Sequence, residues 1–586
     1  MTEHTPADRA VSDEAGTEGA VSDDAGTDRA VSDDAVTRPR ILIAATPTPN
    51  GDLHVGHLAG PYLVGDIYAR YLRAAGTPVT WTTITDDSQT YVVASAARKG
   101  TSPARLAAGA TAAIERTLRG VAIELTSGTE QLLPPVDARY REAVTEFVTA
   151  LHAAGRLRER TVRLPYAERS GQHLYDGLLT GGCPACGAGS NGGACEDCGT
   201  PNNYDELRDP RCTLDPQEPV SIREERILVL PMEEYRAELE AHFAEVTPRW
   251  RPHPKQLIEQ LLSRPLPDIP VTVPGRWGVP APFAPTAGQI VYPWVEAMAA
   301  SMYATWWANG QDPALPYDHH WRAEQGAELV FLHGFDNTYH WGLLDLVLLL
   351  AHGDRYIRPS ANVVNEFYEL EHAKFSTSRN HLIRGTELIE EGVPRDVLRF
   401  YLALTLPERA RTNFTRAGLA LLTDRQLIAP WRELGDALDA ALAGHDGAPL
   451  PVSAAAQARV AALAADLRGS FEPGAFSVAR AAARLAEHLA ELREQAAAGT
   501  EPGDLLAGLR ALLAWSAPIL VDTAEAARAA GIDLALTAGP VSDKIAPFRL
   551  PRLPVGPTGA VVTPIEASVK AKASVESPVE EKDDRS

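Results

Sequence analysis

Apolar residues in the first part of the chain alternate between short unbroken runs and longer stretches with helical spacing. The run "RILIA" (40–44) precedes a helical stretch of about twenty residues, and "PVTWTTI" (78–84) precedes an Ala-rich helical stretch. Strand, helix, strand and helix in this order predict a parallel sheet. The alternation resumes from about 270 to 400, in "GQIVYPWVEAM" and "ELVFLHGFD". The pattern therefore indicates the α/β class.

The spacing changes from about residue 415 to residue 535, where Ala, Leu, Arg and Glu dominate, as in "VARAAARLAEHLAELREQAAAG". This composition predicts an all-α bundle, with turns at "FEPGAF" and "GTEPGD". We interpret Trp431 and Trp515 as core residues of that bundle. The longest apolar stretch, Gly342–Ala351, is about half of what a bilayer span requires and predicts a buried helix.

Both ends of the chain are poor in residues that could form a core. Residues 1–40 repeat a decapeptide ("AVSDEAGTEG", "AVSDDAGTDR", "AVSDDAVTRP") and carry ten acids and four bases. Such acidic sequence buries too little apolar area to offset the entropy of ordering, so we expect disorder here and in the tail "TPIEASVKAKASVESPVEEKDDRS". The net charge of −22 also argues against a generally basic surface for nucleic acid.

The N-terminus shows no basic start followed by an apolar run, so the sequence predicts no signal peptide. Four of the five cysteines lie in one cluster, which suits a metal site in a reducing compartment better than a disulfide framework. We therefore expect a cytoplasmic protein with no membrane contact.

The cysteine cluster has the spacing C-x2-C-x8-C-x2-C, as in Cys183, Cys186, Cys195 and Cys198. Two such turns present four thiolates to one tetrahedral ion, which predicts structural Zn²⁺, and four unrelated thiols is the alternative. Cys212 lies outside the spacing and is expected to be an ordinary half-buried thiol.

Two histidines, His54 and His57, stand three residues apart in "AATPTPNGDLHVGHLAG", where the first strand gives way to a helix. They could be a pair on a helix surface, two ligands of a metal, or part of a phosphate site. The third interpretation follows from the turn formers before the helix, because N–H groups of a helix N-terminus and imidazole donors would face an anion. The local sequence alone leaves the three open.

"PTPNGDLHVGHLAGPYLVGDIYARYLR" resembles the HIGH region of class I aminoacyl-tRNA synthetases, specifically the methionyl enzymes. The resemblance continues in order through "TDDSQ", "DPRCTLDPQEPV", "WGVPAP", "VYPWVEA" and "FLHGFDNTYHW" to "AKFSTSRN", at the place of the KMSKS loop. It implies a Rossmann-type parallel sheet with a zinc-knuckle insertion and a C-terminal all-α helical bundle. The implied parts are disordered repeats (1–39), the first catalytic half (40–154), the insertion (155–265), the second catalytic half (266–412), an anticodon-binding-like bundle (413–535) and a disordered tail (536–586).

The resemblance also implies a two-step reaction, in which an amino acid attacks ATP to give an aminoacyl-adenylate and the acyl group then passes to tRNA. ATP, Mg²⁺ and structural Zn²⁺ are the implied cofactors. The residues that would act on ATP are His54 and His57 for its phosphates, Lys374 as the first loop lysine, and Asn50, Gly51, Gly56, Asp336, Ser376, Thr377, Ser378 and Arg379. The amino acid would be bound by Asp86, which receives its ammonium group, and by Thr46, Thr48, Trp294, Ala297, Met298, Ser301 and Trp341.

Several of these positions depart from the family pattern. The loop reads "KFSTS", so Thr377 replaces the second lysine, and Arg379 is the candidate to compensate because its guanidinium fork suits phosphate. Losing one contact to a charged group, worth about 1.5–3 kcal/mol, would slow activation roughly ten- to a hundredfold. An inactive, decayed domain is the alternative, against which the retained histidines, Lys374 and cysteines count.

The amino acid pocket departs further. Trp294 and Ala297 match the methionyl enzymes, whereas Thr46, Thr48, Glu296, Met298, Ser301 and Trp341 replace residues that are typical there. Threonines beside a thioether would leave their hydroxyls unpaired, so we expect a substrate other than methionine.

The bundle also lacks residues that the family uses to read an anticodon: "RQLIAPWRELGDALDAAL" has no Asn-x-x-x-Arg pair, and "AELREQAAAGTEPGD" no tryptophan. Three functions therefore stay open. The first is a ligase that charges tRNA, and the second is a paralogue in specialised metabolism that passes the acyl group to a small molecule, a peptide or a downstream acceptor protein. The third is a non-catalytic tRNA-binding relative.

Overall fold

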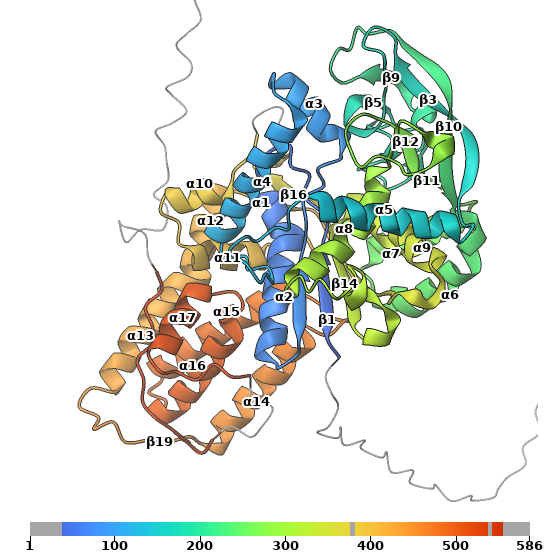
Figure 1. The fold of residues 1–586 in the computed structure, drawn as a ribbon. Coiled ribbons are helices and arrows are strands. Elements are labelled where there is room, and N and C mark those ends of the chain that lie inside the picture. Colours follow the sequence, from blue (N-terminus) through green and yellow to red (C-terminus); the bar gives the residue numbers. More distant parts are fainter. Residues whose placement is uncertain (1–37, 376–380, 537–541, 555–586) are drawn as a thin grey trace, which may run out of the picture. The chain divides into compact units, whose positions relative to one another are not determined.

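The computed structural model describes residues 38–375, 381–536 and 542–554 (Figure 1). Its central feature is a four-stranded sheet in which every pair of neighbours is parallel, in the order β15-β14-β1-β2. These strands are β1 (Arg40–Ala44), β2 (Val79–Thr82), β14 (Glu328–Gly334) and β15 (Pro359–Asn365). The predicted parallel sheet is confirmed, and strands 284 residues or more apart in the sequence pair side by side, such as Arg40 with Glu328.

The run "RILIA" is apolar throughout because both faces of β1 are covered. Ile41 and Ile43 belong to one hydrophobic cluster, and Leu42 and Ala44 belong to the other. Successive side chains of a strand point to opposite faces, so each residue of an unbroken apolar run finds a core. The helices that contribute to the first cluster include α5 (Ala138–Ala153), α8 (Pro293–Ala308) and α9 (Asp345–Ala351), and those of the second include α2 (Leu63–Ala74), α4 (Pro103–Gly120) and α11 (Arg395–Leu404).

The helix expected after β1 is interrupted. A short α1 (Val55–His57) continues into a π-helical turn (Leu58–Tyr62), and only then does α2 begin. Gly60 has non-helical angles (φ −99°, ψ −129°) directly before Pro61. Proline disfavours the helical conformation of the residue before it and lacks an N–H, which explains the break. The break leaves α1 and its two histidines as a separate turn above the end of β1.

The insertion is built on a long antiparallel pair, β3 (Arg158–Ala167) with β10 (Val220–Pro231), flanked by β4 (Gln172–His173) and β11 (Asp268–Pro270). The cysteine cluster lies between β5 (Leu179–Gly182) and β9 (Arg208–Cys212), which pair with each other and with β6 (Gly189–Ser190). Cys212 is fully buried, so the expectation of a half-buried thiol is wrong: the β5–β9 pair covers it. Further elements of the region are β7 (Gly193–Ala194), β8 (Pro201–Asn202), α6 (Arg236–Val246) and α7 (Pro252–Leu262).

The segments that return to the sheet carry most of the remaining candidate residues. The hairpin of β12 (Thr272–Pro274) and β13 (Gln289–Val291) leads into α8, and α3 (Thr90–Arg98) follows the loop after β2. A small sheet, β17-β16-β18, holds the loop that contains Lys374. Its strands are β16 (Tyr368–Leu370), β17 (Ala373–Lys374) and β18 (Thr412–Phe414), and α10 (Gly385–Glu390) follows the loop.

The C-terminal region is helical, as the spacing predicts, with Trp431 and Trp515 both buried in its core. Two features differ from the expectation. β19 (Leu450–Pro451) pairs with β20 (Lys544–Ile545), and Trp431 Nε1 donates a hydrogen bond to the Pro551 carbonyl at 2.8 Å. Residues 542–554 therefore pack on the bundle, although the sequence predicted a disordered tail from 536. The helices are α12 (Arg416–Thr423), α13 (Ala429–Ala441), α14 (Ala454–Gly469), α15 (Val478–Ala497), α16 (Pro502–Ser516) and α17 (Val521–Ala529).

A buried ion pair joins this region to the sheet. Arg399 of α11 donates to Asp66 of α2 at 2.6 Å, and both side chains are almost completely inaccessible to solvent. The same guanidinium donates to the backbone carbonyls of Val121, Ala122, Pro518 and Ile519. Among the described residues, no helix is long and apolar enough to cross a membrane. The stretch predicted as a buried helix lies in α9 and the π-helical turn before it, and both are buried.

Candidate functional site

The candidate site lies at the carboxyl edge of the parallel sheet. The chain leaves β1 toward β2 on one side, whereas β14 lies on the other side, so the strand order reverses next to β1. Open parallel sheets bind ligands beyond the carboxyl ends of the strands at such a point. Two contacts hold the loops after β1 and β2 together: Asp86 N donates to Pro47 O at 3.1 Å, and Thr83 Oγ donates to Ala44 O at 3.0 Å.

His54 and His57 form a reciprocal cap on α1. Each ring accepts a backbone N–H at Nδ1, His54 from His57 N and His57 from His54 N, both at 3.3 Å. The rings stack with centroids 3.6 Å apart. A neutral imidazole that accepts at Nδ1 carries its proton on Nε2. Both Nε2–H groups are therefore the donors that remain for a ligand.

The pKa values of both histidines are low. Burial first, and then the proximity of His57 and of the Arg384 guanidinium, lowers the pKa of His54 to about 2. The ring of His57 is partly open to solvent, but the surrounding walls still desolvate it and lower its pKa to about 4. Both rings are therefore neutral at pH 7 and would bind phosphate as hydrogen-bond donors rather than as cations.

The helix end itself offers less to an anion than the sequence predicted. Val55 N donates to Ile383 O at 2.8 Å, and His57 N is engaged by the cap. Gly56 fits closely between two rings, since a Cβ there would lie 3.0 Å from His54 and from Phe375. Phe375, from the loop after β17, stacks on His54 with centroids 4.3 Å apart. The candidate phosphate donors are thus the two imidazoles, partly covered by Phe375.

Lys374 is paired with an acid of the cysteine cluster's loop. Its Nζ lies 2.6 Å from Glu196 Oε2, and Glu196 stands between two of the cluster's cysteines. Arg411 approaches the neighbouring Asp197 at 3.7 Å. The predicted lysine is therefore within an ion pair that links its loop to the knuckle. The other predicted loop residues, Ser376, Thr377, Ser378 and Arg379, lie outside the described residues.

Two carboxyl groups are buried together below the loop after β2. Asp86 accepts a hydrogen bond from Gln89 Nε2 at 2.7 Å, and Glu296 Oε1 accepts from Tyr140 at 2.5 Å and from Ser88 at 2.8 Å. Burial raises the pKa of Glu296 to about 7. Burial, and then the charge of Glu296, raises the pKa of Asp86 well above its ordinary range. A cation bound here would relieve the repulsion, as the ammonium group of an amino acid does.

A third buried acid, Asp176, stands at the start of the insertion. Its Oδ1 accepts from Tyr204 at 3.0 Å, and Tyr204 and Tyr292 share a hydrogen bond of 2.6 Å. Burial raises the pKa of Asp176 to about 7. Asp336, on the turn after β14, has its pKa raised to about 6 by burial and by Glu196. The site therefore contains several buried carboxyl groups with raised pKa values, which are easily protonated in the absence of a cation.

The predicted pocket residues of α8 lie on one helix, and its first turn carries Trp294. Trp294 stacks on His340 with centroids 3.6 Å apart. Trp341, which the sequence placed in the pocket, instead packs edge-on against Phe331 in the core. Ser301 Oγ donates to Ala297 O at 2.9 Å within the helix, so its hydroxyl is already satisfied. The remaining predicted residues are Met298, which is fully buried, and Thr46, Thr48, Asn50 and Gly51, which lie half-buried in the loop after β1.

His340 was missed by the sequence analysis. Its Nδ1 and Trp294 Nε1 are both buried without a hydrogen-bond partner among the described residues. Burial lowers the pKa of His340 to about 3, so the ring is neutral. His340, Tyr292 and Tyr339 also line a cavity of about 440 Å³ that extends to the insertion. The π-helical turn Thr338–Leu344 explains the miss, because its wider turn changes which residues share a face.

Tyr140, Asp176 and Glu196 were missed as well. Tyr140 reaches Glu296 across 156 sequence positions, and Glu196 reaches Lys374 across 178. The sequence carries no local signal for contacts of this separation.

The four predicted cysteines converge, with their sulfur atoms all within 4.8 Å of one another. Cys183 and Cys198 sulfurs are 3.9 Å apart, and Cys186 and Cys195 sulfurs 3.7 Å. A tetrahedral zinc with Zn–S bonds of about 2.3 Å places its sulfurs about 3.8 Å apart, so the donor set fits Zn²⁺. Each half repeats the same turn, in which Gly187 N donates to Cys183 O and Gly199 N donates to Cys195 O, both glycines having positive φ.

Comparison with known proteins agrees with this geometry. The family described as tRNA synthetases class I (M) matches residues 41–435. A methionine–tRNA ligase of Cytophaga hutchinsonii is 29% identical over 397 residues, which are 66% of this chain and 56% of that protein. The corresponding ligase of Picrophilus torridus is 29% identical over 394 residues, with the same coverage. The match thus spans little more than half the length of these relatives.

Solved structures show the same fold. The crystal structure of Mycobacterium tuberculosis methionyl-tRNA synthetase bound by methionyl-adenylate aligns with a TM-score of 0.66 at 20% identity, covering 88% of this chain and 100% of that one. Its apo form aligns with a TM-score of 0.59 at 18% identity, covering 88% of this chain and 98% of that one.

Proposed function

The chain belongs to the class I tRNA synthetases of the methionyl type, and on this premise we propose that it activates an amino acid with ATP and transfers the acyl group to tRNA. The observation that carries the proposal is the pairing of two kinds of group at one sheet edge. Neutral His54 and His57 offer Nε2–H donors, and the buried acids Asp86 and Glu296 lie beyond the end of the neighbouring strand β2.

Each group has a role in amino acid activation. The histidines would donate to the phosphates of ATP, and these donors stabilise charge that develops when the amino acid carboxylate attacks the α-phosphate. The acids would hold the ammonium group, so that the carboxylate points at the phosphate. Lys374 would exchange Glu196 for the phosphates when ATP binds. Mg²⁺ accompanies ATP in this chemistry, where it offsets phosphate charge, and Asp336 is the nearest candidate to face it.

We infer further that the preferred amino acid has a polar side chain and is not methionine. His340 Nδ1 is buried and unpaired among the described residues, and Trp294 Nε1 and Asp176 Oδ2, which approach each other, both lack a hydrogen bond of normal geometry, so a thioether is a poor partner for these groups. A substrate side chain with hydrogen-bonding atoms would satisfy them. The large cavity lined by His340 leaves room for such a group.

The test is ATP–pyrophosphate exchange by the full chain with a broad panel of amino acids. We expect exchange with one or a few polar amino acids, abolished in His57→Ala and retained in His152→Ala, an exposed histidine of α5. Exchange with methionine alone would overturn the inference about the substrate. Absence of exchange with every amino acid would overturn the proposed activity.

Two further measurements test transfer to tRNA and the role of His340 in binding the amino acid. Charging of bulk tRNA with the amino acid that supports exchange is expected, and exchange without charging would contradict tRNA as the acceptor. His340→Leu removes the polar wall and keeps the site apolar, so it should raise the KM of the polar substrate while leaving the KM of ATP unchanged. An equal rise in both would indicate a general structural defect.

A further inference from the structure

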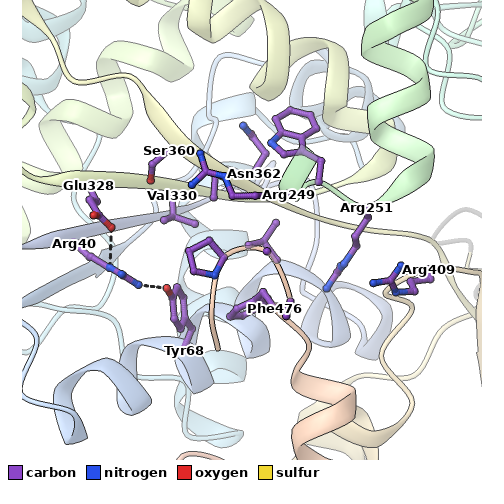
Figure 2. A pocket seen from close by; sticks show the side chains of 16 residues that line it. Arg40, Tyr68, Arg249, Arg251, Glu328, Val330, Ser360, Asn362, Arg409 and Phe476 are labelled. Atoms are coloured by element: carbon purple, nitrogen blue, oxygen red, sulfur yellow. Dashed lines mark hydrogen bonds and ion pairs between the residues drawn. The ribbon is translucent and has the colours of Figure 1, made fainter. Parts of the chain in front are cut away.

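A second cavity, of about 60 Å³ and open to solvent, lies at the opposite edge of the central sheet (Figure 2). Arg40 at the start of β1 and Glu328 at the start of β14 form one wall. The segment between α6 and α7 contributes Arg249 and Arg251, and Arg409 follows α11. The turn 473–476, part of the "FEPGAF" sequence between α14 and α15, closes the cavity from the helical bundle.

Positive charge in this cavity exceeds negative charge. Arg40 pairs with Glu328 at 3.1 Å and also donates to the Tyr68 hydroxyl. Arg249 and Arg409, both exposed, have no carboxylate within ion-pair distance among the described residues. The lining thus retains two guanidinium groups that no acid neutralises.

Arg251 is the most buried of the four arginines, with 11% of its side chain exposed. One of its nitrogens donates to the Val364 carbonyl, and the other, Nη2, is buried without a hydrogen bond to any described residue. Glu408 lies 3.4 Å from Nη2, but it already accepts from Ser477 Oγ at 2.5 Å and Ala479 N at 3.2 Å. Burial lowers the pKa of Arg251, and the charge of Arg409 acts in the same direction. An additional anion would satisfy this group.

The rest of the lining suits a small polar ligand. Figure 2 shows Arg249 and Arg251 from one side and Arg40 from another, with Phe476 between them. Asn362 also lines the cavity, where its amide adds a polar group beside His333 Nε2 at 3.1 Å. Guanidinium groups bind phosphate oxygens in pairs, and an excess of two positive charges in so small a volume favours a ligand with several charges.

We propose that this cavity binds a phosphate-bearing anion with at least two negative charges, whether free pyrophosphate or the polyphosphate of a nucleotide. The site is separate from the one beside His54 and His57, because it lies at the amino rather than the carboxyl ends of the strands. The ligand would bridge the sheet and the bundle, since the lining comes from both. Its binding therefore stabilises the contact between these parts.

The experiment measures pyrophosphate binding to the full chain by calorimetry, in a His57→Ala background that weakens the other phosphate site. The double variant Arg249→Gln, Arg409→Gln removes the two unneutralised charges, and both side chains are exposed, so the fold should persist. The control is Arg432→Gln, an exposed arginine of α13 outside the cavity. We expect the double variant to lose roughly tenfold or more in affinity and the control to match the parent.

A comparison of three ligands shows which phosphate compound binds and whether the cavity prefers phosphate to carboxylate. Pyrophosphate tighter than ATP would identify the free anion, and ATP tighter than pyrophosphate would identify a nucleotide. Citrate, a polycarboxylate of similar charge, is expected to bind at least tenfold more weakly than either. Equal affinity in the double variant and the control, or citrate binding as tightly as pyrophosphate, would overturn the proposal.

Discussion

Removal of the Tyr140 hydroxyl is the sharpest probe of the buried acids. Glu296 Oε1 accepts two hydrogen bonds, from Tyr140 at 2.5 Å and from Ser88 at 2.8 Å, and its other oxygen is buried without a partner among the described residues. Burial raises the pKa of this carboxyl to about 7, and the two hydroxyl donors oppose the rise. Tyr140→Phe removes the shorter bond and leaves the ring, so the pKa must rise further.

The size of the pKa shift follows from the free energy of the lost hydrogen bond between Tyr140 and Glu296. A hydrogen bond to a charged group is worth about 1.5–3 kcal/mol, and one pKa unit corresponds to about 1.4 kcal/mol, so the pKa of Glu296 should rise by about one to two units. The ammonium group of the amino acid binds the ionised form. Amino acid affinity in the parent should therefore rise with pH up to about 7, and in Tyr140→Phe this limb should move to about pH 8–9.

The assay is the pH profile of kcat/KM for the activated amino acid in ATP–pyrophosphate exchange. Tyr303→Phe is a matched control, because this tyrosine of α8 packs against Tyr140 but loses its bond to a different acid, Asp137, at 3.2 Å. A limb that stays in place, moves to lower pH, or moves equally in Tyr303→Phe would refute the reasoning.

Stability gives an independent readout of the same group. Because the folded pKa of Glu296 lies above the ordinary value of 4.5, the folded state binds more protons than the unfolded state between about pH 4.5 and 7. The free energy of unfolding should therefore fall as pH rises through this range and level off above it. In Tyr140→Phe the fall should extend to higher pH, as measured by urea denaturation at pH 5, 7 and 9.

Three further predictions test other parts of the structure. Cys195→Ser removes one sulfur of the zinc tetrahedron, so purified protein should contain well under one equivalent of zinc by atomic emission, and a full equivalent would exclude the cluster as the zinc site. Arg399→Met leaves Asp66 with Arg70 as its remaining cationic partner and deprives four backbone carbonyls of their donor, so it should lower the free energy of unfolding by about 3–5 kcal/mol in urea, whereas a change below about 1 kcal/mol would show that Arg399 does not stabilise this contact. Glu196→Gln frees Lys374 from a half-exposed ion pair and should raise kcat/KM for ATP about two- to fivefold, whereas a decrease would mean that Glu196 assists the reaction.

The sequence predicted the features that depend on neighbouring residues. The strand Arg40–Ala44 was placed at its observed bounds, because an unbroken apolar run with cores on both sides leaves little choice. The cysteine cluster was predicted because two Cys-x-x-Cys turns are themselves local structures. The two histidines were singled out by the turn and helix that carry them, but only the family resemblance related them to ATP, and their reciprocal cap was not foreseen.

The sequence could not predict contacts between residues that are far apart in the chain, nor which residues of a π-helical turn share a face. Nothing near Lys374 indicates Glu196 as its partner, because the contact exists only once the insertion folds over the loop. Trp341 was predicted as a pocket residue, whereas the structure places His340 against Trp294. A single extra residue in a π-helical turn is enough to exchange the two, and local propensity does not reveal it.

The charges at the carboxyl edge of the sheet determine how the two ligands of the candidate site affect each other's binding. At the carboxyl edge the histidines are neutral and the acids are buried, so a triphosphate arriving alone would meet donors but also repulsion from Glu296 and Asp336 to the extent that they are ionised. An ammonium group, or the metal ion that accompanies ATP, removes this repulsion. Amino acid and ATP should therefore bind with positive coupling, each lowering the Kd of the other by the same factor, because the cation that comes with either ligand offsets negative charge that the other ligand meets. Titration of one ligand at several fixed concentrations of the other would measure that factor, and independent binding would contradict the electrostatic coupling.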